Sequence, residues 1–189
     1  MCMAKLIYAM NTSLDGYTED AQGRFGWGAA DDEESHTDIC ELVSKFRSYL
    51  YGRKMYEKMV YWETSDQVRD QPPYLLEFAR RWQAAEKIVY SKTLAEPRSG
   101  RTTIEREFDP DTVRRIKADA EHDIAIAGPE LAAQAIRAGL VDGLLMILRP
   151  VVLGGGKRFF PDGVKLDFEL IEERRLRNGV IILRYAVRG

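Results

Sequence analysis

Residues 123–139 read DIAIAGPELAAQAIRAG and contain one complete strand-to-helix unit. The apolar run Asp123–Ala127 predicts a strand, and Gly128-Pro129 follows it without a spacer. A helix is expected from Glu130 to Ala138, and Gly139 is suited to end it, because glycine adopts the left-handed conformation that commonly closes a helix. The unit indicates an α/β protein in which a helix begins directly at the end of a strand.

Both flanks of this unit continue the alternation of strands and helices. On the N-terminal side we expect four strands, at Leu6–Met10, Ser48–Tyr51, Lys87–Tyr90 and Thr102–Ile104. Four helices are expected between them: a first helix capped by Asp31-Asp32, whose apolar residues Ile39, Leu42, Val43 and Phe46 follow helical spacing, and helices from Arg53 to about Val60, from Pro72-Pro73 and from Asp109-Pro110. On the C-terminal side the apolar run Leu144–Leu153 predicts a buried central strand with an irregularity at Arg149-Pro150. Phe168–Leu176 and Val180–Val187 alternate across Asn178-Gly179, which predicts a terminal hairpin.

This order of elements predicts the architecture. Strands that alternate with helices argue for a sheet covered on both faces. The terminal hairpin adds antiparallel strands, so the expected sheet is mixed. The sequence has no internal repeat and no linker, and residues 1–189 are therefore expected to form a single domain.

The composition excludes several classes of function. The 28 Lys and Arg residues and 30 Asp and Glu residues give a formal charge of −2, which is not the basic footprint of a nucleic-acid-binding protein. No apolar stretch approaches the roughly 20 residues that cross a bilayer, so no membrane partner is expected. The two cysteines, Cys2 and Cys40, form no disulfide framework. With no signal peptide expected, the predicted location is the cytoplasm.

Three common ligand motifs are also excluded. Phe159 stands where the third glycine of a dinucleotide-binding fingerprint would follow Gly154-Gly155-Gly156. Arg158 after Gly156-Lys157 rules out a Walker loop. The two histidines, His36 and His122, and the two cysteines lack the paired spacing of a zinc site, so no metal is expected.

Glycine-marked turns follow four of the expected strands, at Asp15-Gly16, Gly52-Arg53-Lys54, Gly128-Pro129-Glu130 and Gly154-Gly155-Gly156. The ends of neighbouring strands form the ligand crevice in sheets of this kind. Helices that begin at Gly52 and Gly128 offer backbone N–H groups to an anion, and Arg53-Lys54 suits a phosphate monoester. Each turn alone has an ordinary explanation, because such glycines commonly serve backbone geometry and a pair such as Arg53-Lys54 is commonly solvated.

Together, six blocks in order resemble a known group of proteins. The blocks are Ser13–Tyr17, Tyr51–Glu57, Val89–Leu94, Ala127–Leu131, Gly139–Asp142 and Arg149–Pro161. Over nearly its whole length the chain is similar to members of the dihydrofolate reductase-like superfamily, in the branch related to the reductase domain of bacterial riboflavin biosynthesis. The resemblance implies a three-layer α/β/α sandwich around a mixed, mostly parallel sheet, NADPH as cofactor, and a homodimer.

The resemblance also assigns cofactor-binding residues. The phosphates and ribose of NADPH are expected to contact residues of three turns, namely Gly52, Arg53, Lys54 and Tyr56; Ser91, Lys92 and Thr93; and Gly128, Pro129, Glu130 and Leu131. Pro129 stands where relatives often have a second glycine or a serine, and it removes one N–H donor from the pyrophosphate site. The nicotinamide ring is expected beside the first turn, at Ala9, Leu14, Asp15 and Gly16.

Function is expected to follow from this arrangement. The resemblance implies an NADPH-dependent reductase that transfers hydride to a heterocyclic or imine-bearing small molecule, either pterin-like or like the riboflavin precursor 5-amino-6-(5-phosphoribosylamino)uracil. Asp15 is the candidate proton donor, although its side chain could instead cap a turn and a water could supply the proton. Trp62, Leu153 and Gly154 are the candidate substrate contacts. Trp62 has an alternative as a core or interface aromatic residue. Two other readings stay open: a non-catalytic NADP(H)-binding protein and a dimeric structural protein.

Two departures from the relatives concern the substrate. Residues 57–63 lack the acidic-acidic-Pro-x-Leu-x-x-Arg stretch with which the riboflavin enzymes hold a ribose phosphate. Dihydrofolate reductases hold the pterin with a carboxylate from the first helix, a place that Glu34 or Asp38 could fill.

Overall fold

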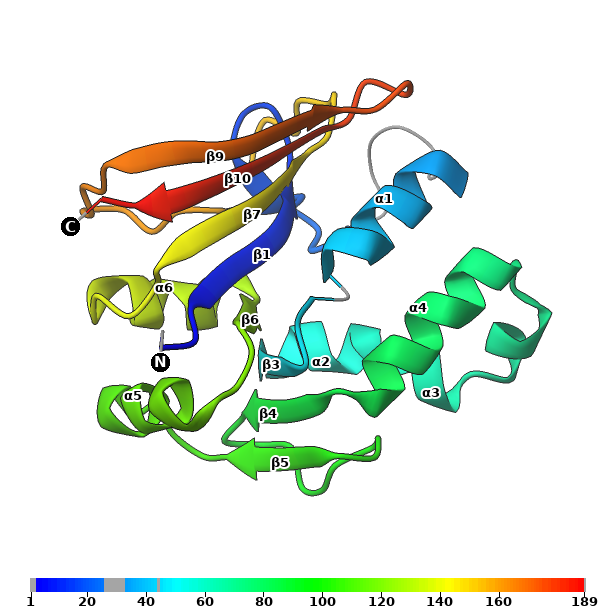
Figure 1. Ribbon diagram of the computed structural model, residues 1–189, viewed down its shortest axis with the longest axis horizontal. Helices are drawn as coiled ribbons and strands as arrows, with labels where there is room; N and C mark the ends of the chain where they lie inside the picture. The colour runs from blue at the N-terminus through cyan, green and yellow to red at the C-terminus, as the bar shows by residue number, and fades with distance from the viewer. Residues whose placement is uncertain (1–2, 26–32, 44, 189) are drawn as a thin grey trace.

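A computed structural model describes residues 3–25, 33–43 and 45–188, and eight strands of this part form one mixed sheet. The order across the sheet is β5-β4-β3-β6-β1-β7-β10-β9. The strands are β1 (Leu6–Thr12), β3 (Ser48–Gly52), β4 (Glu86–Tyr90), β5 (Thr102–Glu105), β6 (Ile124–Ala127), β7 (Gly143–Leu148), β9 (Phe168–Arg175) and β10 (Ile181–Val187). The strands from β5 to β7 are parallel, and β10 and β9 continue the sheet in antiparallel pairing (Figure 1).

Helices cover both faces of this sheet. They are α1 (Glu33–Val43), α2 (Arg53–Met59), α3 (Tyr61–Thr64), the 3-10 helix η1 (Asp66–Asp70), α4 (Pro73–Ala84), α5 (Pro110–Asp119) and α6 (Pro129–Arg137). Figure 1 shows α5 and α6 on one side of the sheet and α1 and α4 on the other. The expected three-layer sandwich with a C-terminal antiparallel hairpin is therefore confirmed.

Local sequence signals account for several boundaries. Asp109 caps α5 by accepting hydrogen bonds from the N–H groups of Asp111 and Thr112, and Pro110 occupies the first turn, where its missing N–H costs nothing. Gly179 has φ +85° in the turn between β9 and β10, which is the conformation that the Asn-Gly pair predicts for a tight hairpin.

The apolar run after residue 143 was expected to continue as a strand to Leu153, and this expectation is wrong. Strand β7 ends at Leu148. Pro150 has no N–H for the ladder, and the chain turns there as the N–H of Val151 donates to the carbonyl of Arg149 at 2.8 Å. The residues that follow lead into a second, two-stranded sheet of β2 (Tyr17–Glu19) and β8 (Lys157–Arg158), which no sequence signal predicted.

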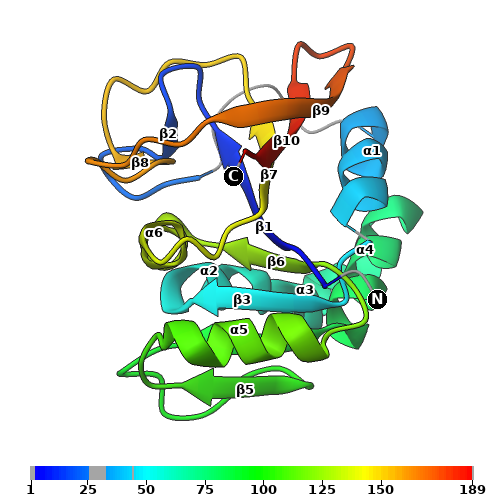
Figure 2. The ribbon, with the colours of Figure 1, turned by 60° about the vertical axis from the view of Figure 1, so that its left-hand side comes forward.

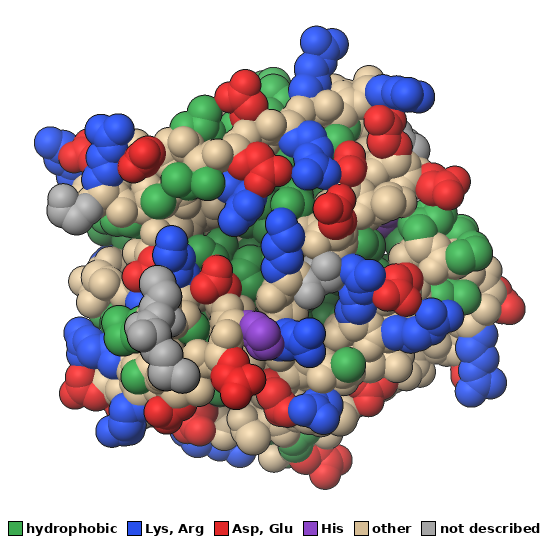
Figure 3. Space-filling view, viewed as in Figure 1, with side chains coloured by type: hydrophobic (Ala, Val, Ile, Leu, Met, Phe, Trp, Pro, Cys, Tyr) green, Lys and Arg blue, Asp and Glu red, His purple; other side chains and the backbone are tan. Residues whose placement is uncertain are grey.

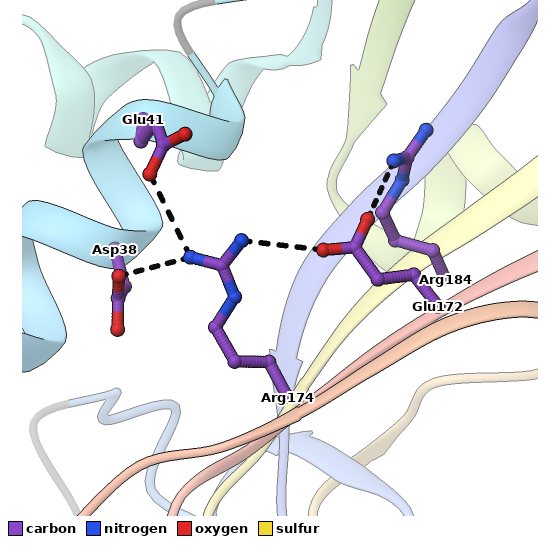
Figure 4. A network of polar contacts seen from close by, with 5 residues as sticks. All are labelled: Asp38, Glu41, Glu172, Arg174 and Arg184. Carbon is purple, nitrogen blue, oxygen red and sulfur yellow. Dashed lines mark hydrogen bonds and ion pairs between the residues drawn. The ribbon is translucent and has the colours of Figure 1, made fainter.

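An ionic network connects α1 to the hairpin. Arg174 on β9 contacts Asp38 at 2.9 Å and Glu41 at 3.6 Å on α1, and Glu172 at 3.3 Å on its own strand (Figure 4). Glu172 in turn accepts from Arg184 of β10 at 2.8 Å. These contacts hold α1 against the sheet edge and direct Asp38 toward the hairpin.

The surface carries charges of both signs, and the described helices are short. Figure 3 shows acidic and basic side chains interspersed over one face of the molecule.

Among the helices that the structure describes, none is long and apolar enough to cross a membrane. Within the same residues, no group of three or more His, Cys, Asp or Glu side chains is arranged to hold a metal ion.

Candidate functional site

A cleft crosses the carboxyl ends of β3, β4 and β6, and we call it the charged cleft. Its volume is about 260 Å³. Figure 2 shows β3, β5 and β6 pointing to the same side of the molecule, as parallel strands of one sheet must. Ten residues predicted to bind a cofactor come together in its lining, namely Gly52, Arg53, Lys54, Ser91, Lys92, Thr93, Gly128, Pro129, Glu130 and Leu131.

The floor of the charged cleft requires glycine at position 128. Gly128 has φ +104°, which L side chains rarely adopt. A Cβ atom there would lie 3.6 Å from Met55 Cβ and 3.7 Å from the backbone nitrogen of Gly52, so the ends of β3 and β6 approach each other closely. Helix α6 begins at Pro129, and its first residues Pro129, Glu130 and Leu131 line the cleft, so the N–H groups of Glu130 and Leu131 lie at this end of the sheet without a side-chain cap.

Charged side chains of both signs line the cleft. Lys157 from β8 contacts Glu130 at 2.6 Å and Glu19 at 3.4 Å, and so joins α6 to β2. The hydrogen bond from Lys157 lowers the pKa of Glu130, which is therefore a carboxylate near neutral pH. Arg53 and Lys54 are exposed at the start of α2, with Arg53 3.5 Å from Glu57. The cleft can offer these cations and the amides of α6 to a phosphorylated ligand.

A second cavity, which we call the aromatic pocket, lies on the face of the sheet that α1 and α4 cover. Its volume is about 400 Å³, within the usual range for small-molecule sites. Small residues of the sheet, among them Ala9, Ala125 and Ala127, form its floor. Trp62 and Phe78 stand in its wall, with ring centroids 5.0 Å apart in an edge-to-face arrangement.

The two cavities are adjacent and share part of their walls. Met10 of β1, Phe25 and Met55 of α2 line both the charged cleft and the aromatic pocket. A ligand bound across the strand ends therefore reaches the edge of a site that can hold a flat ring. Sequence reasoning missed these three residues, and it also missed Lys58, because nothing local marks the inner side of α2 as a pocket wall.

Several other predicted site residues lie elsewhere. Ala9 and Trp62 line the aromatic pocket and not the charged cleft. Tyr56 lines neither cavity, because its side chain is fully buried and its hydroxyl contacts Ser99 Oγ at 2.9 Å and accepts from the N–H of Arg98 at 2.8 Å. Tyr56 is a core residue, so its assignment to the cofactor is wrong.

The first turn and the triple-glycine loop form a separate unit outside the lining of both cavities. This unit contains five predicted site residues, namely Leu14, Asp15, Gly16, Leu153 and Gly154. The N–H of Leu14 donates to Val151 at 2.8 Å, and Asp15 accepts from the N–H groups of Leu153 at 3.1 Å and Gly154 at 2.7 Å. These contacts fasten the two loops to each other.

Asp15 is also unsuited to donate a proton. The hydroxyl of Ser13 donates to its carboxylate at 2.6 Å, and the amides of Leu153 and Gly154 add to this effect. Together these donors lower the pKa of Asp15 to about 2. The hydrogen bonds give Asp15 a loop-positioning role and its lowered pKa makes it a poor proton donor near neutral pH, while its assignment as the catalytic acid stays a prediction.

We expect Asp15→Asn to lower the melting temperature near neutral pH, because an amide accepts from these donors more weakly than a carboxylate. The folded pKa of about 2 lies below the reference value of 3.8, so Asp15 contributes stability above about pH 4 that is lost as the pH falls toward 2. Thermal unfolding at a series of pH values should therefore show the difference between wild type and variant shrinking below pH 4. A difference that stays constant down to about pH 2 would contradict this role.

The two candidate pterin-binding carboxylates of the first helix also lie outside both cavities. Asp38 is held by Arg174, as described above, and Glu34 is 3.5 Å from Arg177. Neither lines the aromatic pocket.

Comparisons with known proteins agree with this architecture. The YyaP protein of Bacillus subtilis (strain 168), whose description is "uncharacterized", is 26% identical over 187 residues, which are 98% of this chain and 96% of that protein. The crystal structure of a putative riboflavin biosynthesis protein from Shewanella sp. PV-4 has a TM-score of 0.76 at 20% identity, covering 99% of this chain and 100% of that chain. Dihydrofolate reductase from Enterococcus faecalis, in complex with NADP(H) and RAB-propyl, has a TM-score of 0.64 at 13% identity, covering 98% of this chain and 97% of that chain.

The solved structures confirm the dihydrofolate reductase-like fold expected from the sequence. The family model "RibD C-terminal domain" matches residues 4–182, almost the whole chain. The protein therefore belongs to the RibD C-terminal domain family.

Proposed function

We propose that this protein is an NADPH-dependent reductase of a small organic molecule. One observation carries the proposal: a cleft lined by cations, two carboxylates and the first turn of α6 shares Met10, Phe25 and Met55 with an aromatic pocket. The charged part suits the phosphates of a dinucleotide, and the aromatic part suits a planar acceptor. Membership of a family named for a reductase domain of riboflavin biosynthesis supports the same class of reaction.

The residues of the charged cleft fit NADPH. A Cβ atom at Gly128 would fill the space between the two strand ends, so the glycine keeps backbone accessible where a pyrophosphate needs close approach. Arg53 and Lys54 would hold the adenosine 2′-phosphate, and Ser91, Lys92 and Thr93 would flank the ribose. When bound, NADPH supplies a hydride.

The chain contributes position, charge and exclusion of water. The cations of the cleft neutralise phosphate charge and fix the orientation of the bound molecule. Met10 and Met55 form apolar walls where the two cavities meet, which keeps water from the reacting atoms. Trp62 and Phe78 provide aromatic surface on which a planar substrate can pack.

The experiment that tests this function combines binding with turnover. Protein is titrated with NADPH by calorimetry, and NADPH absorbance is then followed in the presence of pterin, pyrimidine and quinone-type acceptors. Saturable NADPH binding with consumption of at least one acceptor is the expected result. Tight binding without turnover across the panel would leave a non-catalytic binding protein, and no binding at all would refute both.

Replacing Arg53 by alanine is expected to weaken NADPH binding by about tenfold or more, because hydrogen bonds to charged groups contribute about 1.5–3 kcal/mol. NADH lacks the 2′-phosphate, so its dissociation constant should hardly change. Calorimetric titration with both cofactors measures the two effects, with the exposed Arg114→Ala as a matched control on α5. Equal losses for NADPH and NADH would count against the 2′-phosphate assignment.

We also propose the homodimer that the resemblance implies. Strand β9 lies at the edge of the sheet, where Leu170 and Ile171 are 46% and 55% exposed. Apolar side chains on an edge strand favour pairing with another chain.

A further inference from the structure

The polar atoms around the aromatic pocket already have partners within the protein. The hydroxyl of Tyr49 donates to the carbonyl of Val43 at 3.2 Å. The hydroxyl of Tyr51 accepts from Trp82 Nε1 at 3.1 Å, and that of Tyr61 accepts from Gln71 Nε2 at 3.3 Å. All three tyrosines present ring surface to the pocket. The bond of Tyr49 uses its O–H donor, whereas the bonds of Tyr51 and Tyr61 use the hydroxyl oxygen as acceptor and leave the O–H donor to a ligand.

Two further polar residues of the lining follow the same pattern. The hydroxyl of Thr18 donates to the carbonyl of Lys157 at 3.1 Å, and Asn11 Oδ1 accepts from Arg149 Nε at 3.0 Å. A strongly polar ligand would lose its hydrogen bonds to water on entering the pocket and would form few new ones. Each polar group buried without a partner costs several kcal/mol. The pocket thus favours a ligand whose buried surface is mainly apolar.

Lys58 is the charged residue among the described residues of this lining. Its ammonium lies 3.0 Å from the ring centroid of Phe25, which lines both cavities, so the cation stands near the place where they join. Lys58 as a whole is exposed, and partial desolvation of its ammonium lowers its pKa; nearby Lys54 acts in the same direction, while Glu19 and Asp20 oppose the shift. The ammonium can replace its contact with the ring by a hydrogen bond to a ligand atom.

We propose, building on the reductase function above, that the substrate is a planar, uncharged, conjugated carbonyl or imine compound. Its ring system packs among Trp62, Phe78 and the tyrosine rings, and its carbonyl oxygen or imine nitrogen accepts a hydrogen bond from Lys58. In the reaction the carbonyl or imine carbon gains the hydride from NADPH, the electrons of the double bond move to the heteroatom, and a proton from Lys58 neutralises it. Lys58 then regains its proton from water.

Two alternative substrates fit this pocket less well. A phosphoribosylated pyrimidine carries a doubly charged phosphate and several hydroxyl groups, and a pocket with one cation and mostly aromatic and aliphatic walls offers them little. A folate pterin is held by a carboxylate, and the described residues of the lining include none. Both would have to bury polar groups against rings, at a cost that the flat uncharged compound avoids.

Binding of phenanthrenequinone to the protein without cofactor tests the proposal. Isothermal calorimetry and quenching of tryptophan fluorescence report the complex, since Trp62 lines the pocket. We expect saturable binding that is at least about tenfold tighter than binding of dihydrofolate or of the phosphoribosylated pyrimidine. Lys58→Met should weaken quinone binding by about tenfold, the loss expected for a hydrogen bond from a charged donor. Lys58→Arg should restore most of the affinity, and the exposed Lys165→Met, which lies outside both cavities, should leave it unchanged.

The outcomes separate this proposal from the reductase function. If the protein binds NADPH but binds dihydrofolate or the pyrimidine better than the quinone, the substrate class is overturned and the reductase function stands. If the quinone binds with equal affinity to wild type and Lys58→Met, the role of Lys58 is overturned. If the quinone binds as expected and NADPH does not bind, the pocket assignment stands and the proposed reductase function fails.

Discussion

Gly156→Ala is expected to destabilise the protein by more than about 3 kcal/mol, the combined cost of a strained backbone and overpacking. Gly156 has φ +127°, and a Cβ atom there would overlap the carbonyl oxygen of Glu19 and lie 2.8 Å from the carbonyl carbon of Asp20. Both obstacles are backbone atoms, so no side chain can move to make room. Denaturant unfolding followed by circular dichroism measures the loss.

The two preceding glycines provide matched controls. Gly154 has φ +71°, but a Cβ atom at this position would have no neighbour within 4 Å, so Gly154→Ala should cost only the backbone strain, about 1 kcal/mol. Gly155 has open space and no positive φ, and Gly155→Ala should stay within about 0.5 kcal/mol of wild type. If the three substitutions lower the free energy of unfolding equally, the close backbone approach at Gly156 does not determine the need for glycine, and flexibility of the loop does.

The same substitution should also affect the charged cleft. Gly156 precedes β8, whose Lys157 pairs with Glu19 of β2 and with Glu130 of α6. Displacing this strand moves Lys157 away from the cleft, so the Gly156→Ala protein that remains folded should bind NADPH more weakly than Gly155→Ala. The triple-glycine loop thus holds β8 in position and contributes no residue to the lining of the charged cleft.

The glycine-marked turns and the family resemblance together predicted much of the lining of the charged cleft. The glycines at 52 and 128 end parallel strands, and the carboxyl ends of parallel strands meet at one edge of a sheet. Arg53 and Lys54 follow one of these glycines directly, so they had to lie at the same edge. The prediction failed at Tyr56. The first turn of α2 exposes Arg53 and Lys54, but the helix directs Tyr56 into the core, and the sequence of this block does not show which side chains face inward.

Contacts between distant residues explain what sequence reasoning missed. The donors that fix Asp15 come from Leu153 and Gly154, about 138 residues away in sequence, and no local pattern could assign them. Strands β2 and β8 have three and two residues, too few for a periodic signal in the sequence. They form because these two distant segments pair with each other. The aromatic pocket assembles residues from β1, β3, α1, α2, α3 and α4, none of which is distinctive alone.

Lys87→Met is expected to cost about 2–4 kcal/mol of stability, because a buried cation that satisfies several carbonyls would be lost. Lys87 is 1% exposed, and its ammonium donates to the carbonyls of Trp82 at 3.0 Å, Gln83 at 3.3 Å and Ala85 at 2.9 Å. These carbonyls lie at the C-terminal end of α4, where that of Trp82 also accepts from the N–H of Ala85 at 3.2 Å and where a positive charge interacts favourably with the helix dipole. Methionine keeps the length and apolar stem of lysine, so the change removes the donor with little loss of packing.

The position of α4 makes this contact relevant to the candidate site. Trp82 at the end of the helix also donates to the hydroxyl of Tyr51 in β3, and Phe78 one turn earlier stands in the wall of the aromatic pocket. A loosened helix end should therefore widen the pocket as well as lower stability. For a chain of this length, about 2–4 kcal/mol corresponds to a fall in melting temperature of roughly 5–15 °C.

Thermal and denaturant unfolding measure the effect, with the exposed Lys165→Met as the control for the same chemical change. If Lys87→Met is as stable as this control, water must donate hydrogen bonds to the three carbonyls at the end of α4 in place of Lys87. The buried ammonium would then be dispensable for stability. If it is destabilised and also binds phenanthrenequinone more weakly, while Lys165→Met does neither, the end of α4 both stabilises the fold and shapes the pocket. The two readouts together thus separate a purely structural lysine from one that sets the geometry of the site.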